Sequence, residues 1–292
     1  MNKIVMILIM LSALACEKMP VNPDISYKRA VTGFFNTDTS STQSLFIGGI
    51  ADVKDDSMYF NELIEVSELE ELTFTIDGEI IPFEIEAVPY FETAIERCIR
   101  FIFPFRALHE YRVQIQHENG YSAVALCRFP GQINPVVEML ADSSLECSWA
   151  PVTDAMAYCL SGAVWGIEKD HIIRMDDFVF DWEINSDNGI NTIRQTPLQT
   201  LTHYTITQEI IQRNLKEAQD RIDREQLPLK LHSYTIRFYA CPKDMAVYLT
   251  EDSYEIFEAK VISFDYSNLD GNCVGLISGY TFSDYTCLLP TH

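Results

Sequence analysis

Basic side chains are scarce in this chain: 21 Lys and Arg stand against 43 Asp and Glu, which gives a formal net charge of −22. A surface this acidic repels phosphate backbones, so we expect no nucleic-acid partner. Glycine and proline number 12 each in 292 residues, and 47% of the chain is hydrophobic, which excludes collagen-like and globally disordered proteins. A chain of this length predicts about two domains.

Motifs for catalysis and metal binding are also missing. The chain has no Cys-x-x-Cys, no His-Glu-x-x-His, no Gly-x-Ser-x-Gly and no glycine-rich phosphate loop. We therefore predict a protein that is not an enzyme, has no catalytic residues and needs no cofactor. The nearest approach to a calcium loop is the acidic segment with Asp181, Glu183 and Asp187, whose spacing does not match an EF-hand. The alternative for this segment is a solvated acidic face.

One apolar run opens the chain, from Ile4 to Leu14 directly after Lys3. It is shorter than the roughly 20 apolar residues that span a bilayer, and its position predicts a secretory signal peptide over residues 1–15. A buried N-terminal core helix is the alternative. The polar residues 16–26, which contain two prolines, predict a flexible tether before the folded part.

The end of this run, Ala13-Leu14-Ala15-Cys16, resembles a bacterial lipobox. The resemblance implies a mature protein that begins at Cys16, with its thiol lipidated and its acyl chains, such as palmitate, inserted in a membrane. Glu17 follows the cysteine where an inner-membrane lipoprotein would carry aspartate. The resemblance therefore implies the outer membrane, at either the cell surface or the periplasmic face.

Alternation of apolar and polar residues dominates the chain from residue 27 onward. Asp77-Gly78 and Asn119-Gly120 each lie between two alternating runs, a pattern that predicts β-hairpins with tight turns. Residues 27–130 hold about seven such short strands at regular spacing, which is typical of an Ig-like β-sandwich. The proline-bounded residues 131–135 are the expected domain boundary.

The second domain is expected over residues 136–265. Its first strand places Leu145, Cys147 and Trp149 on one face, and the sequence Trp149-Ala-Pro, followed by Ala155 and Tyr158, resembles a fibronectin type III domain. An inserted α-helix is predicted at about 207–226, because a threonine N-cap precedes a regular apolar stripe. Turn residues in 266–292 predict a final Gly- and aromatic-rich hairpin that packs on this second domain.

The predicted fold class is therefore all-β, with two tandem Ig/fibronectin type III-like β-sandwiches, the second carrying the inserted helix. With the lipobox, this arrangement resembles a family of uncharacterised Gram-negative surface lipoproteins that contain a domain of unknown function. Residues 105–130 and 266–280 carry most of the resemblance, and Cys273 and Leu276 depart from the family's glycine-rich ending. The resemblance implies no established activity for any residue.

The chain has eight cysteines, and lipidation of Cys16 would leave an odd number. An exported protein is able to form disulfides, and we predict Cys273 with Cys287 and Cys98 with Cys127 as the pairs. A chain without disulfides is the alternative.

Aromatic residues make up 12% of the chain. Tyr59, Phe60, Tyr90 and Trp165 are the candidates for exposed contacts with sugars or with a protein, and core packing is the alternative for each. We expect a binding or scaffold module for an envelope protein or an extracellular polymer, attached to the membrane through its N-terminal lipid. The alternatives are a carbohydrate- or peptide-processing enzyme on a β-sandwich and a purely structural envelope spacer.

Overall fold

The computed structural model describes residues 29–49, 51–54, 57–59, 66–90, 94–118, 120–168, 171–179, 202–245 and 267–289. The lipobox and several other predicted site residues lie outside these ranges: Ala13, Leu14, Ala15, Cys16, Phe60, Asp181, Glu183 and Asp187. Among the described helices, none is long and apolar enough to cross a membrane.

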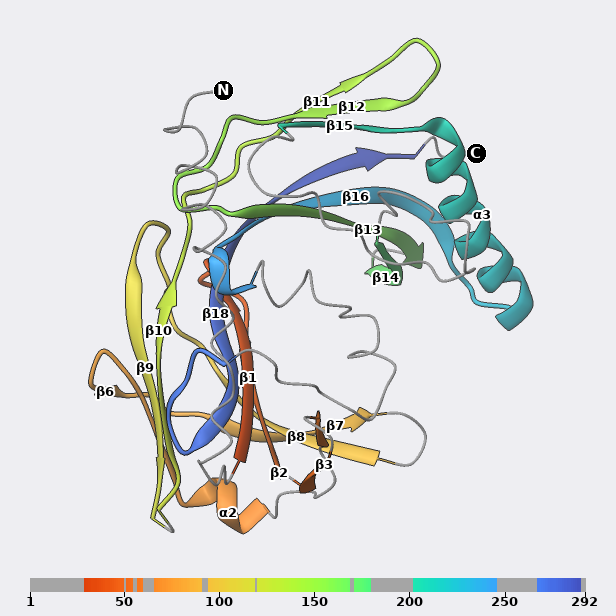
Figure 1. Cartoon of the computed structure of the whole chain (residues 1–292). Coiled ribbons are helices and arrows are strands. Elements are labelled where there is room, and N and C mark those ends of the chain that lie inside the picture. The colour runs from red at the N-terminus through yellow and green to blue at the C-terminus, as the bar shows by residue number, and fades with distance from the viewer. Residues whose placement is uncertain are drawn as a thin grey trace, which may run out of the picture.

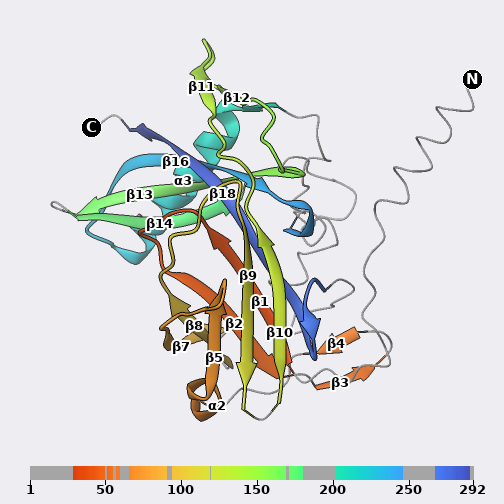
Figure 2. The same ribbon diagram turned by 90° about the vertical axis from the view of Figure 1, so that its left-hand side faces the viewer.

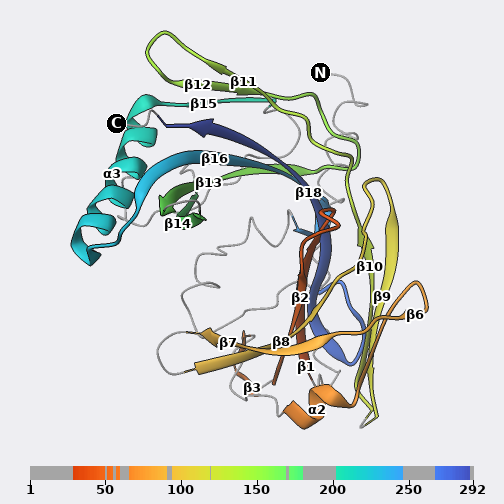
Figure 3. The same cartoon turned by 180° about the vertical axis from the view of Figure 1, so that it is seen from behind.

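A single eight-stranded sheet extends through the described part of the molecule (Figure 1). In spatial order its strands are β14 (His171–Val179), β13 (Ala157–Glu168), β16 (Lys230–Cys241), β18 (Cys273–Leu288), β1 (Arg29–Asn36), β2 (Gln43–Gly49), β8 (Ala94–Phe101) and β7 (Glu84–Tyr90). Figures 1 and 3 show that this sheet is bent, so that its two halves face different directions.

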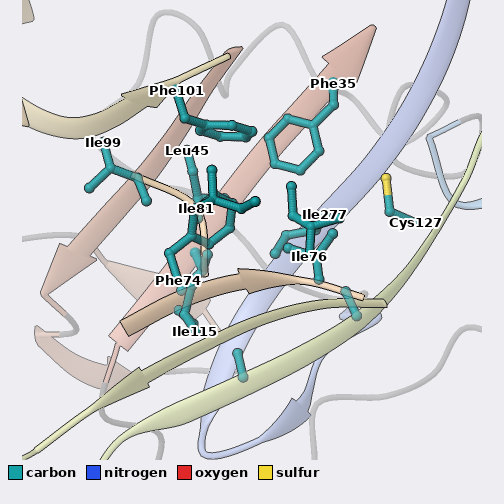
Figure 4. Close-up of a cluster of buried hydrophobic side chains, with 14 of the residues drawn as sticks. Phe35, Leu45, Phe74, Ile76, Ile81, Ile99, Phe101, Ile115, Cys127 and Ile277 are labelled. Carbon is teal, nitrogen blue, oxygen red and sulfur yellow. The ribbon is translucent and has the colours of Figure 1, made fainter. Parts of the chain in front are cut away.

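The half that contains β1, β2 and β8 is covered by a five-stranded sheet, and the two layers form the first sandwich (Figure 2). The covering strands are β17 (Asp270–Gly271), β10 (Ser122–Arg128), β9 (Glu110–His117), β5 (Leu72–Ile76) and β6 (Glu79–Ile80). Between the layers lies an aromatic core that includes Phe35, Phe74 and Phe101 (Figure 4). Phe35 stacks on Phe105 there, with ring centroids 5.3 Å apart. The short helix α2 (Val66–Glu70) contributes Leu69 to this core. The strands β3 (Ala51–Lys54) and β4 (Ser57–Tyr59) form a separate two-stranded antiparallel pair.

The other half of the large sheet is covered by three strands and a helix, which form the second sandwich. These elements are β11 (Val136–Met139), β12 (Leu145–Ser148), β15 (His203–Ile206) and α3 (Gln208–Glu225). Leu145, Cys147 and Trp149 are all buried in this core, as their shared face predicts. The sheets confirm the predicted all-β sandwich class. The inserted helix is confirmed as well, because α3 begins after the N-cap Thr207 and ends at Gln226, whose backbone is left-handed.

The expected turns are present in the first sandwich. Asp77 and Gly78 have positive φ angles of 52° and 82° between β5 and β6, as a two-residue hairpin of type I′ requires. Gly120, between β9 and β10, has φ of 87°.

The predicted hairpin in residues 266–292 is wrong. Residues Cys273–Leu288 form one continuous strand, β18, which pairs in parallel with β1 and antiparallel with β16. Gly279 is not at a turn: a Cβ there would lie 2.8 Å from the ring of Phe129, so the glycine gives that ring its space. The C-terminal segment therefore belongs to both sandwiches and connects them.

Two asparagines that precede β18 fix this segment, one to β18 itself and one to the β9–β10 hairpin. Asn268 donates from Nδ2 to the carbonyl of Ile277 (2.8 Å) and accepts from the Ile277 amide at Oδ1 (3.0 Å). Asn272 accepts from the Ser122 amide (2.8 Å) and donates to the Gly120 carbonyl (3.0 Å), which fixes the tip of the β9–β10 hairpin. The segment that carries much of the family resemblance thus has a structural role.

Candidate ligand-binding face

The large sheet has a second face, opposite the two large hydrophobic cores, and we call it the inner face. Part of it is buried: Val274 and Leu276 of β18 are 0% exposed, and Ala157, Cys241 and Met245 form a third, small hydrophobic cluster. On β16, Tyr234, Ile236 and Phe238 belong to the second core, so strand alternation directs Thr235, Arg237 and Tyr239 to the inner face. We name the inner-face side chains of β13, β16 and β18 the Arg237 stripe. Its members are Trp165, Thr235, Arg237, Tyr239, Tyr280, Phe282, Asp284 and Thr286.

An ion pair lies in the middle of the stripe. Arg237 and Asp284 are directly opposite on β16 and β18, and the guanidinium donates from Nε to Oδ1 and from Nη2 to Oδ2, both at 2.7 Å. The Arg237 Cζ also lies 4.1 Å from the centroid of the Phe282 ring, which is a cation–π contact. The hydrogen bonds to Asp284 raise the pKa of Arg237 above its ordinary value, so the guanidinium stays charged at neutral pH. Because the side chains are still 35% and 34% exposed, water or a ligand can reach them.

Aromatic rings continue the stripe beyond the ion pair. Tyr239 lies opposite Phe282, and the Tyr280 ring is 5.6 Å from that of Tyr239 and 6.3 Å from that of Phe282, measured between centroids. Asn36 of β1 donates to the Tyr280 hydroxyl (3.4 Å), and this contact orients the ring. All three rings are partly exposed, and those of Tyr239 and Tyr280 also pack against the small buried cluster on this face.

Trp165 lies at the opposite end of the stripe. Its indole Nε1 donates to Oγ1 of Thr235 (2.9 Å), and this hydroxyl also contacts Oγ1 of Thr286 at 3.0 Å. The ladders of β13 with both neighbouring strands shift register at Trp165, a β-bulge that sets the direction of its side chain. Trp165 is one of the contact residues predicted from the sequence, and the structure places it on β13, with its side chain on the inner face.

The turn between β1 and β2 is a compact hydrogen-bonded unit beside Tyr280. Asn36 Oδ1 accepts from the Asp38 amide (2.9 Å) and from the Ser41 hydroxyl (2.8 Å), and Gln43 Oε1 accepts from the Asn36 amide (3.0 Å). Hydrogen bonds from Ser40 lower the pKa of Asp38, and the positive charge of Arg237 lowers it further. The turn thus presents a fixed carboxylate near the ion pair.

Among the residues that the structure describes, no other predicted contact residue has a side chain placed on the Arg237 stripe. Tyr59 and Tyr90 are the last residues of β4 and β7, and only their backbone is described. Phe60 lies outside the described residues. Sequence reasoning missed Arg237, Phe282 and Asp284, although alternation along residues 231–240 could have indicated that Arg237 lies opposite the core face.

Neither predicted disulfide forms, since Cys98, Cys127, Cys273 and Cys287 are all thiols. Cys273 and Cys287 lie near opposite ends of the 16-residue strand β18, far beyond the reach of a disulfide. Cys127 belongs to the first core, whereas Cys98 alternates with the core residues Ile99 and Phe101 and so lies on the opposite face of its sheet.

A second charged cluster closes the far end of the first sandwich. Arg29 binds Glu68 of α2 through two hydrogen bonds of 2.7 and 2.9 Å, and its guanidinium lies 5.5 Å from the centroid of Tyr121. The buried His117 ring stacks on Tyr121 at 4.6 Å, and its Nε2 lies 3.6 Å from a carboxylate oxygen of Glu71. Burial, with the Glu68 charge beside it, raises the pKa of Tyr121 and keeps the phenol neutral. The cluster attaches α2 and the residue after it to β1 and to the β9–β10 hairpin, which is a structural role.

The arrangement of the Arg237 stripe suits binding. A fixed ion pair, hydroxyl groups and partly exposed rings provide hydrogen-bond donors, acceptors and apolar contact area. Across the described ranges, no group of three or more His, Cys, Asp or Glu is placed to hold a metal ion.

Comparisons with known proteins add little to this description. No family model matches the chain, and no curated protein matches it significantly. Among solved structures, one similar chain is a crystal structure of the FN1–FN3 domains of chicken CNTN1, at 13% sequence identity. The match covers 76% of this chain and 63% of that chain with a TM-score of 0.16, a value too low to support any argument.

Proposed function

We propose that this chain is a non-catalytic binding module that an acylated Cys16 holds on the outer membrane and that takes an extracellular polymer on the Arg237 stripe. The supporting observation is a partly exposed aromatic and ionic row on the inner face, opposite the two large cores. Exposed aromatic residues that surround fixed polar groups are typical of ligand sites in folds without catalytic groups.

The stripe is arranged in advance of any ligand. Hydrogen bonds to Thr235 and from Asn36 hold the rings of Trp165 and Tyr280, and the ion pair holds the Arg237 guanidinium. Because these side chains are already ordered, a ligand loses little affinity to the cost of immobilising them.

An envelope protein is the second candidate partner, and it is favoured by exposed apolar residues on an edge strand. Val136 and Met139 of β11 are 56% and 62% exposed, and β11 is the outermost strand of its sheet. An extended peptide pairs with such an edge through backbone hydrogen bonds.

Protease treatment of intact cells, followed by blotting for the mature chain, tests the location that the proposal requires. We expect digestion without lysis, and we expect Cys16→Ser to leave the protein unanchored and released from the membrane fraction. Protection until the outer membrane is opened would contradict a surface binding role and favour a periplasmic scaffold or spacer.

A further inference from the structure

We infer that the ligand of the Arg237 stripe is an uncharged carbohydrate chain, with neighbouring hydroxyls on the Arg237–Asp284 pair and sugar rings on the aromatic row. This inference rests on the proposed function and specifies the ligand class of the same site. Four properties of the stripe carry it: its hydrogen-bonding pattern, its rings, its charge and its length.

The ion pair presents donors and acceptors side by side. Arg237 uses Nε and Nη2 for Asp284, and among the described residues the N–H groups of Nη1 have no partner. Each carboxylate oxygen keeps accepting capacity after one hydrogen bond. A hydroxyl both donates and accepts, so two neighbouring hydroxyls of one sugar match such a pair. At 35% and 34% exposure, both side chains are reachable and yet held in place.

The aromatic row supplies the apolar half of the site. Phe282 lies directly beside the ion pair, and Tyr280 and Tyr239 follow within 6.3 Å between centroids. A pyranose has C–H groups on its faces and hydroxyls around its rim. A ring platform next to a polar pair therefore matches both parts of one sugar unit.

Charge disfavours acidic polysaccharides. The chain carries a formal charge of −22, which repels them. At the centre of the stripe the charges of Arg237 and Asp284 offset each other, so an uncharged chain with hydroxyl groups binds there without this repulsion.

The length of the stripe indicates a chain rather than a single sugar. Trp165 lies opposite Ser233, and Phe282 lies opposite Tyr239 on the same strand β16. From Ser233 to Tyr239 an extended strand rises roughly 20 Å, which accommodates several sugar rings in a row.

The test is an array of neutral and uronate-containing oligosaccharides, with poly-lysine as a third probe, applied to the full chain purified in detergent. Phe282→Ala and Asp284→Asn remove the ring platform and the charged acceptor. Two matched controls lie outside the stripe: Phe46→Ala removes an inner-face ring that is 36% exposed on β2, and Glu110→Gln breaks the exposed ion pair with Arg128. Circular dichroism and urea midpoints establish that each variant is folded.

We expect the chain to bind neutral oligosaccharides with an affinity that hardly changes from low to high salt. Phe282→Ala and Asp284→Asn each weaken binding about tenfold or more, the equivalent of about 1.4 kcal/mol, and the two controls bind as the wild type does.

The other outcomes separate the two proposals. Preferential, salt-sensitive binding of uronates or poly-lysine that Phe282→Ala weakens would overturn the neutral carbohydrate and leave the stripe as the binding site. Binding that both stripe variants retain, or no binding to any probe, would overturn the stripe as a polymer site and the inference with it.

Discussion

At the scale of single residues, burial of a thiol links the stability of the second sandwich to pH. Cys147 is 0% exposed, in the core between β12 and its neighbours. Burial, with the Glu146 charge as a lesser cause, raises the pKa of Cys147 from 9.0 to about 12. Between these values the unfolded chain has lost a proton that the folded chain keeps. The free energy of unfolding therefore falls as pH rises through this window.

Substitution of Cys147 tests this linkage. We expect the contribution of Cys147 to approach about 1.4 kcal/mol per pH unit between pH 9 and 12, and Cys147→Ala to show a shallower decline than the wild type. Urea unfolding of both proteins across the window provides the measurement. Equal slopes for Cys147→Ala and the wild type would show that burial of this thiol does not set the dependence.

The candidate site was only partly predictable from the sequence, for a reason that its residues make clear. Trp165 was identifiable because a tryptophan is a large aromatic group in any context. Arg237 and Asp284 are unremarkable charges until β16 pairs with β18, 47 residues apart along the chain. Pairing over that distance depends on tertiary structure, and no local pattern specifies it.

At the scale of elements, β18 shows why glycine can mislead a sequence-based prediction. Gly275 has φ of 135°, and a Cβ there would lie 2.0 Å from the carbonyl oxygen of Val31 on β1. The residue thus permits close approach of two parallel strands. A glycine of this kind has the same sequence signature as a turn glycine, which is why a hairpin was expected. The Asp77-Gly78 turn was predictable because its two flanking strands are adjacent in sequence.

Alanine substitutions at two glycines distinguish two causes of lost stability, a steric clash with a neighbouring strand and an unfavourable backbone conformation. Gly275→Ala meets both a forbidden φ and the Val31 backbone, and we expect a loss of about 3 kcal/mol or more in unfolding free energy. Gly78→Ala also has positive φ but has nothing within 4 Å of its Cβ, and we expect about 1 kcal/mol. Urea denaturation of both variants gives the comparison, and similar losses would argue against the close pairing of β1 with β18.

At the scale of the whole molecule, the strands and the helix were predictable, and the way the two sandwiches are joined was not. Local alternation and turn residues specify each strand, as in β5, β9 and β16. The parallel pairing of Arg29–Asn36 with residues of β18 joins the two ends of the described chain. The result is one sheet shared by two cores, and the Arg237 stripe lies on the inner face of that sheet.

Differential scanning calorimetry of the full chain tests this central claim most directly. β18 contributes Ile277 to the first core and packs Tyr285 against the second. If one sandwich unfolds and releases β18, the core of the other sandwich therefore becomes exposed to water. We expect one transition whose calorimetric enthalpy equals its van't Hoff enthalpy. Two resolved transitions, as expected for independent tandem domains, would contradict it.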